Sequence, residues 1–118
     1  MKIVTCNVNG IRSAHRKGFF DWYKKQKADV LCLQELKAQK DQIDVEEMLS
    51  KNSYSYFKCA EKKGYSGVSI HSKKEPDKVI YEYGDKEFDN EGRYIEAQFS
   101  DLSVISLYAP SGSSGDIR

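Results

Sequence analysis

Residues 30–35, VLCLQE, constrain the fold of this chain most strongly. The four apolar residues from Val30 to Leu33 form a run typical of a buried strand. Two polar residues, Gln34 and Glu35, follow it without any intervening turn. The sequence therefore predicts a rigid buried strand that delivers a carboxylate at its end.

Helices are expected early in the chain and antiparallel hairpins later. Within residues 17–27, lysines lie opposite Phe19, Phe20 and Tyr23, a spacing typical of an amphipathic helix. Residues 44–47 have the spacing of a capping box ahead of a second short helix. The pattern predicts a β-rich α/β fold, with further strands at 2–7, 54–59, 67–71, 78–83, 93–99 and 103–108 and turns between them, one of them at 89–92.

Composition limits the class of protein. The chain has 118 residues, enough for one small domain, and its 39% hydrophobic and 31% charged content is typical of a soluble globular protein. No apolar run approaches the ~20 residues of a membrane span, and the N-terminus lacks the apolar core of a signal peptide. A net charge of +1 argues neither for nor against a nucleic-acid partner.

The cysteines and histidines carry little functional signal. Three cysteines are an odd number, so we expect them to be reduced, which is typical of a cytoplasmic protein. Neither His15 nor His71 has partners at metal-ligand spacing, so we expect both at the surface and predict no zinc site.

Three predicted strands end in polar side chains: Asn7, Glu35 and Tyr108. For any one of them the commoner explanation is that it marks where the strand meets water. Together they fit Mg²⁺, which needs only one or two carboxylates and leaves other positions to water and phosphate. A Tyr hydroxyl and an Asn amide could hydrogen-bond a phosphoryl oxygen beside it.

Two basic segments provide a second indication. Residues 10–17 join a predicted strand end to a helix start, and they carry Arg12, Arg16 and Lys17. Residues 61–67 form a predicted Gly-containing hairpin with Tyr65 exposed. Both could hold nucleic-acid phosphates, and both could equally be solvated surface.

Five motifs together resemble the exonuclease III family, the Mg²⁺-dependent apurinic/apyrimidinic endonucleases of base-excision repair within the endonuclease/exonuclease/phosphatase superfamily. They are CNVNGIRS (6–13), LQELK (33–37), GYSGV (64–68), EGRYIEAQF (91–99) and SLYAPSG (106–112). The resemblance covers residues 1–118 and is strongest to the N-terminal part of a bacterial member. It implies about the first half of a four-layer α/β sandwich, with residues 1–118 as the N-terminal part of one domain.

The resemblance also implies roles for single residues. Glu35 matches the family's Mg²⁺-binding glutamate, with Mn²⁺ as an alternative ion, and Asn7 matches the asparagine beside that metal. Tyr108 matches the tyrosine that contacts the scissile phosphate. The positions that match DNA-facing residues are Arg12, Ser13, Lys17, Lys37, Tyr65 and Arg93.

Two departures from the family pattern matter. Asn9 stands where some relatives have an acidic residue, and the family's Gly-Asp-x-Asn and Ser-Asp-His segments do not occur in these 118 residues. We therefore expect the isolated chain to be a fragment, inactive alone and prone to aggregate. Apolar faces that include Val4, Leu31, Leu33, Ile105 and Leu107 are expected to lose part of their cover.

The resemblance implies an enzyme that cuts DNA 5′ to abasic sites and degrades duplex DNA from 3′ ends. The full-length protein is expected to be a monomer without a membrane partner. Two alternatives stay open at this point. One is a superfamily phosphodiesterase that acts on a phosphoinositide or sphingomyelin. The other is a non-catalytic module that binds nucleic acid through its basic segments alone.

Overall fold

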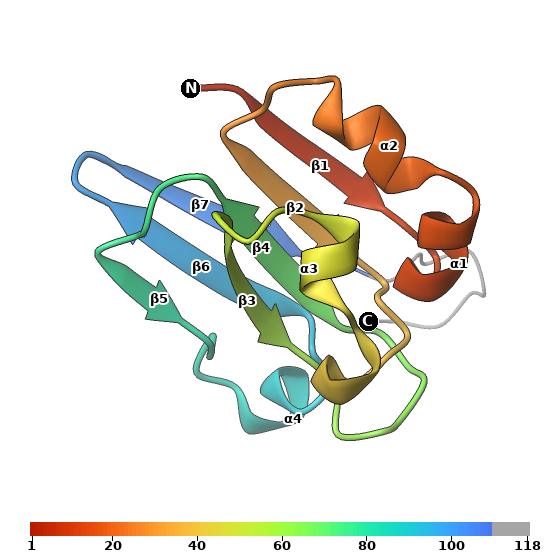
Figure 1. Ribbon diagram of the computed structural model, residues 1–118. Coiled ribbons are helices and arrows are strands. Elements are labelled where there is room, and N and C mark those ends of the chain that lie inside the picture. The colour runs from red at the N-terminus through yellow and green to blue at the C-terminus, as the bar shows by residue number, and fades with distance from the viewer. Residues whose placement is uncertain (110–118) are drawn as a thin grey trace.

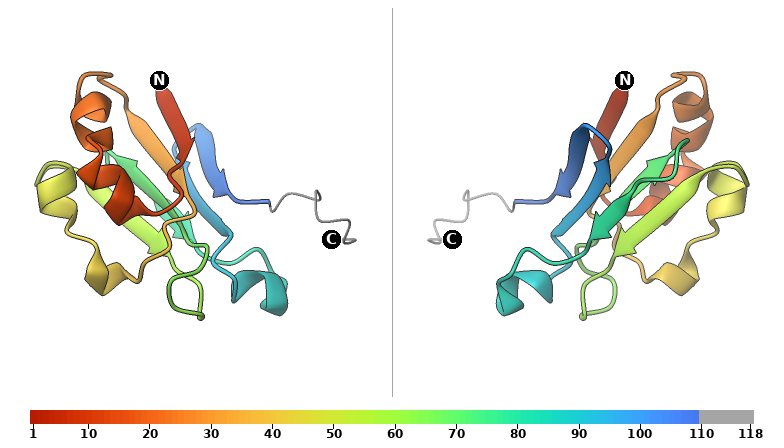
Figure 2. Two further views of the ribbon diagram at one scale, coloured as in Figure 1. Left: turned by 90° about the vertical axis from the view of Figure 1, so that its right-hand side faces the viewer. Right: turned by 90° about the vertical axis from the view of Figure 1, so that its left-hand side faces the viewer.

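The computed structural model describes residues 1–109, which form three layers (Figure 1). Figure 2 shows helices on one side of a four-stranded sheet and a three-stranded sheet on the other side. The α/β class is therefore confirmed. The order of the layers is helices, four-stranded sheet and three-stranded sheet. These are three of the four layers that the resemblance implies.

The four-stranded sheet has the order β1-β2-β4-β3. Its strands are β1 (Ile3–Asn7), β2 (Val30–Gln34), β3 (Tyr54–Lys58) and β4 (Val68–Ser72). β1 and β2 are parallel, with Asn7 opposite Gln34, whereas β4 is antiparallel to both β2 and β3. The parallel pair therefore brings Asn7 and the residue after Gln34 to the same edge of the sheet.

The three-stranded sheet is an antiparallel meander in the order β5-β6-β7. Its strands are β5 (Lys78–Ile80), β6 (Tyr94–Phe99) and β7 (Leu102–Leu107). β5 is shorter than the predicted 78–83, because the backbone N–H of Tyr83 donates to Asp89 instead of joining the sheet.

The helices are short and lie mostly on one face of the four-stranded sheet (Figure 2). They are α1 (Ile11–Arg16), α2 (Phe19–Lys24), α3 (Val45–Met48) and α4 (Lys86–Asp89), with a 3₁₀ helix at Lys40–Gln42. α3 begins as the capping pattern predicts, since the Asp44 side chain accepts a hydrogen bond from the Glu47 backbone.

One prediction about local structure was wrong. Residues 10–17, expected as a connecting segment, contain helix α1, because Ile11 is buried and its N–H donates to the Leu36 carbonyl oxygen. The turn predicted at 89–92 is confirmed at residues 90–92. Helix α4 directly before it was not predicted, and Asp85 caps this helix by accepting a hydrogen bond from the Phe88 N–H.

Each face of β2 contributes to a different core, which explains its uninterrupted apolar sequence. Leu31 and Leu33 pack with Ile11, Phe20 and other residues beneath the helices. Val30 and Cys32 face the second sheet and share a core with its inward side chains, which are Ile95, Ala97 and Val104. The strand is therefore fully buried.

Gln34 fastens the two sheets together at the end of β2. Its side-chain nitrogen donates to Thr5 Oγ1 and to Ser106 Oγ, both at 3.0 Å. Ser106 Oγ in turn donates to the Leu33 carbonyl oxygen at 2.9 Å. Because Gln34 and Ser106 are buried and hydrogen-bonded, they fix β7 relative to β2, and thereby Tyr108 relative to Glu35.

The outer face of the second sheet is exposed in the described part of the chain. Ile105 and Leu107 are 48% and 50% exposed, as expected. The expectation for Leu31 and Leu33 was wrong, because the helices cover both completely, and Val4 is half-buried against the same core. Within residues 1–109 no helix is long and apolar enough to cross a membrane. Cys6, Cys32 and Cys59 are free thiols.

The surface position expected for His71 was also wrong. Its side chain is buried, and its two ring nitrogens are 2.7 Å from the hydroxyls of Ser69 and Ser55. Burial lowers the pKa of His71 from 6.5 to about 3. His15 is half-buried beside Glu47, at 3.2 Å.

A His71→Gln variant should flatten the acid dependence of stability. The folded state keeps His71 neutral, whereas the unfolded chain protonates it below about pH 6.5, so stability falls as the pH drops from about 6.5 toward 3. One such proton contributes a slope of up to ~1.4 kcal/mol per pH unit. Urea unfolding at several pH values between 4 and 7 measures how the free energy of unfolding depends on pH. His15→Gln is the control, and an unchanged slope in His71→Gln would disprove this role.

Candidate active site

The site begins with Asn7 and Glu35, at the ends of the two parallel strands and beside α1 (Figure 1). The Asn7 side-chain nitrogen donates to Glu35 Oε1 at 2.8 Å. The Asn7 side-chain oxygen accepts from the Asn9 backbone N–H at 3.0 Å. Asn7 thereby orients the carboxylate, while both side chains stay accessible at the sheet edge.

The backbone around Glu35 is held in an uncommon conformation. Asn9, Glu35, Lys37 and Ser66 all have positive φ, between 48° and 52°, and the described chain has only one other non-glycine residue of this kind, Lys27. Such residues persist only where surrounding contacts enforce them, and they cluster at functional sites. This clustering supports a functional role for the sheet edge.

The enforcing contacts come from the hairpin between β3 and β4. The backbone N–H groups of Leu36 and Lys37 donate to the carbonyl oxygens of Gly67 and Ser66, at 3.1 and 2.8 Å. Gly67 N–H and Ser66 Oγ donate in turn to the Gly92 carbonyl oxygen, at 3.0 and 3.3 Å. The segment that carries Glu35 is thus supported through two layers of backbone contacts.

Lys37 lies beside Glu35 at the same edge of the four-stranded sheet. Its ammonium group is 3.6 Å from Glu35 Oε2 and donates a short hydrogen bond to Asn9 Oδ1. Asn9 therefore places a neutral amide here that Lys37 contacts. Within residues 1–109 Lys37 is the one cation that pairs with the Glu35 carboxylate.

Tyr108 reaches the site from the other sheet. Its backbone N–H donates to the Arg93 carbonyl oxygen at 2.9 Å, which holds it just beyond β7. Partial burial raises the pKa of Tyr108, and the nearby Glu35 carboxylate raises it further. The phenol therefore stays protonated at neutral pH and can act as a hydrogen-bond donor.

Arg93 and Tyr65 form a unit next to Tyr108. Arg93 Nη2 donates to the Tyr65 hydroxyl at 3.1 Å and pairs with Glu91 at 3.1 Å. The Arg93 Nε atom is buried without a hydrogen-bond partner among residues 1–109. The Arg93 side chain is thus mostly buried, and its hydrogen bond holds Tyr65 beside the site.

The predicted basic residues lie on α1 and its flanks. Arg12 and Ser13 line a shallow cavity of about 360 Å³ together with Arg16, Lys37 and Gly10. Ser13 and Lys17 line a second cavity, of about 280 Å³, that includes Asn7 and Asn9. The structure therefore brings all the sequence-predicted site residues to one end of the two sheets.

The donor set fits a hard divalent cation that takes few ligands from the protein. Residues 1–109 contain no cluster of three or more His, Cys, Asp or Glu side chains that could hold a metal ion. Glu35 supplies one accessible carboxylate, and Asn7 adds an amide. This matches Mg²⁺, which takes one or two carboxylates and keeps several waters.

Sequence reasoning missed the residues that support the site from behind. Gln34 joins the sheets, and Ser66 and Gly92 hold the segment after Glu35. A signal for Gly92 was present in the sequence, because a glycine directly before a strand often marks a positive φ or a close backbone approach. Nothing in the sequence indicated that Ser66 would share that conformation.

The chain is similar to known nucleases over almost its whole length. Residues 4–116 match the model of the endonuclease/exonuclease/phosphatase family. A Bacillus subtilis exodeoxyribonuclease is 41% identical over 116 residues, which are 98% of this chain and 45% of that protein. The DNA repair nuclease APEX1 of Danio rerio is 38% identical over 120 residues, 100% of this chain and 39% of that protein.

Two solved nuclease structures have a similar fold. An AP endonuclease from Archaeoglobus fulgidus superimposes with a TM-score of 0.80 at 33% identity, over 95% of this chain and 42% of that one. A 3′-5′ exonuclease from Neisseria meningitidis gives a TM-score of 0.80 at 28% identity, over 95% and 43%.

The fold is therefore that of a two-sheet α/β domain, which this chain shares with the two solved nuclease structures. The chain belongs to the endonuclease/exonuclease/phosphatase family. Nucleases of this family generally depend on a divalent metal ion. The chain spans less than half the length of the curated relatives described above.

Proposed function

We propose that the full-length protein is a DNA repair nuclease of the exonuclease III type, which cuts the phosphodiester 5′ to abasic sites and degrades duplex DNA from 3′ ends. The observation that carries this proposal is the convergence of Glu35, Asn7 and Tyr108 at one sheet edge, flanked by the basic residues of α1. The similarity to an exodeoxyribonuclease and to DNA repair endonucleases supports the choice of DNA.

Each residue has a role in this proposal. Glu35 is the dominant ligand for Mg²⁺, with Asn7 beside it as an orienting group and additional ligand. Tyr108, protonated at neutral pH, donates a hydrogen bond to a phosphoryl oxygen. The bound ion would polarise the phosphate and stabilise its developing charge. Arg12, Ser13, Lys17, Lys37, Tyr65 and Arg93 position the DNA.

A substrate panel tests the proposal against the other phosphodiesterases of the superfamily. The full-length protein is incubated with Mg²⁺ and an abasic duplex, a 3′-recessed duplex, a phosphoinositide or sphingomyelin. Hydrolysis of the two DNA substrates alone is expected. Turnover of a lipid without turnover of DNA would overturn the proposal, and DNA binding without any hydrolysis would favour a non-catalytic module.

Arg12→Ala and Lys17→Ala should each weaken binding to every duplex sequence to a similar extent. A phosphate contact releases counterions from DNA, so each lost contact should reduce the slope of log K against log salt by roughly one unit. Fluorescence anisotropy at several salt concentrations, without metal, measures the slope. Lys51→Ala, an exposed lysine beyond α3, is the control. Slopes equal to wild type would show that α1 is solvated surface.

A further inference from the structure

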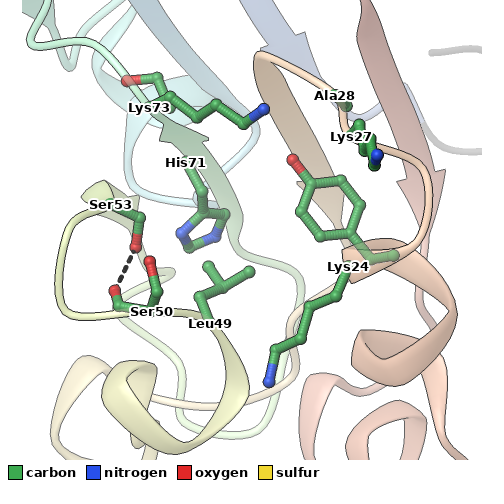
Figure 3. A pocket seen from close by; sticks show the side chains of 10 residues that line it. Lys24, Lys27, Ala28, Leu49, Ser50, Ser53, His71 and Lys73 are labelled. Atoms are coloured by element: carbon green, nitrogen blue, oxygen red, sulfur yellow. Dashed lines mark hydrogen bonds between the residues drawn. The ribbon is translucent and has the colours of Figure 1, made fainter.

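A third cavity lies at the other end of the four-stranded sheet from the proposed active site. It is about 230 Å³ in volume and lies between α2, the loop after α3 and the end of β4 (Figure 3). Ala28, just before β2, lines it, whereas Asn7 and Glu35 lie near the opposite end of the parallel pair. The nuclease proposal uses none of its residues.

The inner surface of this cavity offers apolar groups. Ala28 and Leu49 are 3% and 8% exposed, and the ring of Tyr23 adds an aromatic wall. His71 also faces it (Figure 3), but both of its ring nitrogens are already hydrogen-bonded to serines. Because burial lowers the pKa of His71 to about 3, the imidazole presents a neutral flat surface.

The rim, in contrast, is strongly basic. Lys24, Lys27 and Lys73 line the cavity, and Figure 3 shows Lys73 and Lys24 on different sides of it. None of the three ammonium groups has an ion-pair or hydrogen-bond partner within residues 1–109, and no carboxylate lines the cavity. Two acidic residues, Asp29 and Glu75, are each two positions from one of these lysines in sequence, and neither lines the cavity. Asp29 accepts a hydrogen bond from the Lys2 backbone N–H.

Two of the serine hydroxyls that line the cavity are occupied by the protein. Ser53 Oγ donates to the Ser50 carbonyl oxygen at 2.8 Å, and Ser72 Oγ donates to the Lys74 carbonyl oxygen at 2.7 Å. Within residues 1–109 the lining donors without a hydrogen-bond partner are the three ammonium groups, the Tyr23 hydroxyl and Ser50 Oγ, and only the ammonium groups carry charge. A ligand that fits must bring negative charge to the rim and a flat apolar body to the interior.

We propose that this cavity binds a small aromatic carboxylate, with its ring against Leu49, Tyr23 and His71 and its carboxylate among the three lysines. The volume is below the ~300 Å³ at which drug-sized sites begin, so the ligand has one ring or two fused rings. The site is separate from the proposed nuclease function, and binding does not depend on that function.

The test uses 2-naphthoate as the probe and 2-naphthamide as its neutral counterpart. Titration of the ¹⁵N-labelled full-length protein should give saturable shifts at the amides of Ala28, Leu49 and Lys73, with a dissociation constant of about 1 mM or below. The amide should bind at least ~10-fold more weakly, because it lacks the charge that the lysines neutralise. Equal affinities for the two compounds would overturn the proposal.

Matched variants test the lysines separately. The double change Lys24→Gln and Lys73→Gln should weaken 2-naphthoate binding by about 10-fold or more, from the loss of two nearby charges. Lys25→Gln with Lys74→Gln removes the neighbouring lysines, which do not line the cavity, and should leave affinity within about twofold. Equal losses in both double variants would contradict the site. Shifts confined to Ile105 and Leu107 would show instead that the exposed face of the second sheet binds the probe.

Discussion

A Glu35→Gln variant of the full-length protein is expected to require much more Mg²⁺ and to turn over at least ~100-fold more slowly at limiting Mg²⁺. Glutamine keeps the size of the side chain, and it can keep the contact with Asn7. It removes the negative charge that a hard cation requires, and metal stabilisation of a phosphoryl transition state contributes several kcal/mol. DNA binding measured without metal should change less.

Two readouts separate this role from a structural one. Activity is measured across a Mg²⁺ titration, and Mn²⁺ binding is measured directly by electron paramagnetic resonance, which does not depend on turnover. Glu47→Gln is the matched control, since Glu47 is also an exposed carboxylate that contacts a basic partner, in this case His15. Wild-type rates for Glu35→Gln at limiting Mg²⁺ would rule out Glu35 as the dominant ligand.

A Gly92→Ala variant is expected to lose about 3 kcal/mol or more of stability and to disturb the site as well. A Cβ atom at Gly92 would lie 2.5 Å from the Ala60 nitrogen, 2.7 Å from the Cys59 carbonyl carbon and 2.9 Å from the Lys58 oxygen. All three are backbone atoms, so no side-chain rotation relieves the overlap. Positive φ at this position adds a further ~1–2 kcal/mol for a residue with a Cβ.

The matched control is Gly64→Ala. Gly64 also has positive φ, at 71°, but a Cβ there meets no atom of residues 1–109 within 4 Å. It should therefore lose only the ~1–2 kcal/mol that the left-handed conformation costs. Urea unfolding compares the two variants. The same loss in both would show that the close approach at Gly92 is relieved without cost, and that this glycine does not hold the hairpin behind Glu35.

Much of the fold could be predicted because its signals are local. The unbroken apolar run of β2 predicted a strand covered on both sides, and the structure places a core on each side of it. The spacing of Asp44 and Glu47 correctly predicted the start of α3. Helix α1 was missed because its only buried residue, Ile11, is anchored by Leu36, which is distant in sequence.

The candidate site likewise has residues that the sequence predicted and residues that it did not. The polar residues at strand ends could be found from the sequence, because strand direction alone brings Asn7 and Glu35 together. Their support could not be found, since Gln34, Ser66 and Gly92 act through contacts that only the packed sheets create. The burial of His71 was missed for the same reason, because serines of two strands enclose it.

The most direct measurement of the central proposal is cleavage of a 5′-labelled duplex that contains one abasic site. The full-length protein is incubated with that duplex in Mg²⁺, in EDTA, and in Mg²⁺ with the Glu35→Gln variant. We predict a single incision 5′ to the abasic site in Mg²⁺, none in EDTA and a strongly reduced rate for the variant. Incision at the same rate in EDTA, or no incision by the wild-type protein in Mg²⁺, would contradict a metal-dependent nuclease site built on Glu35.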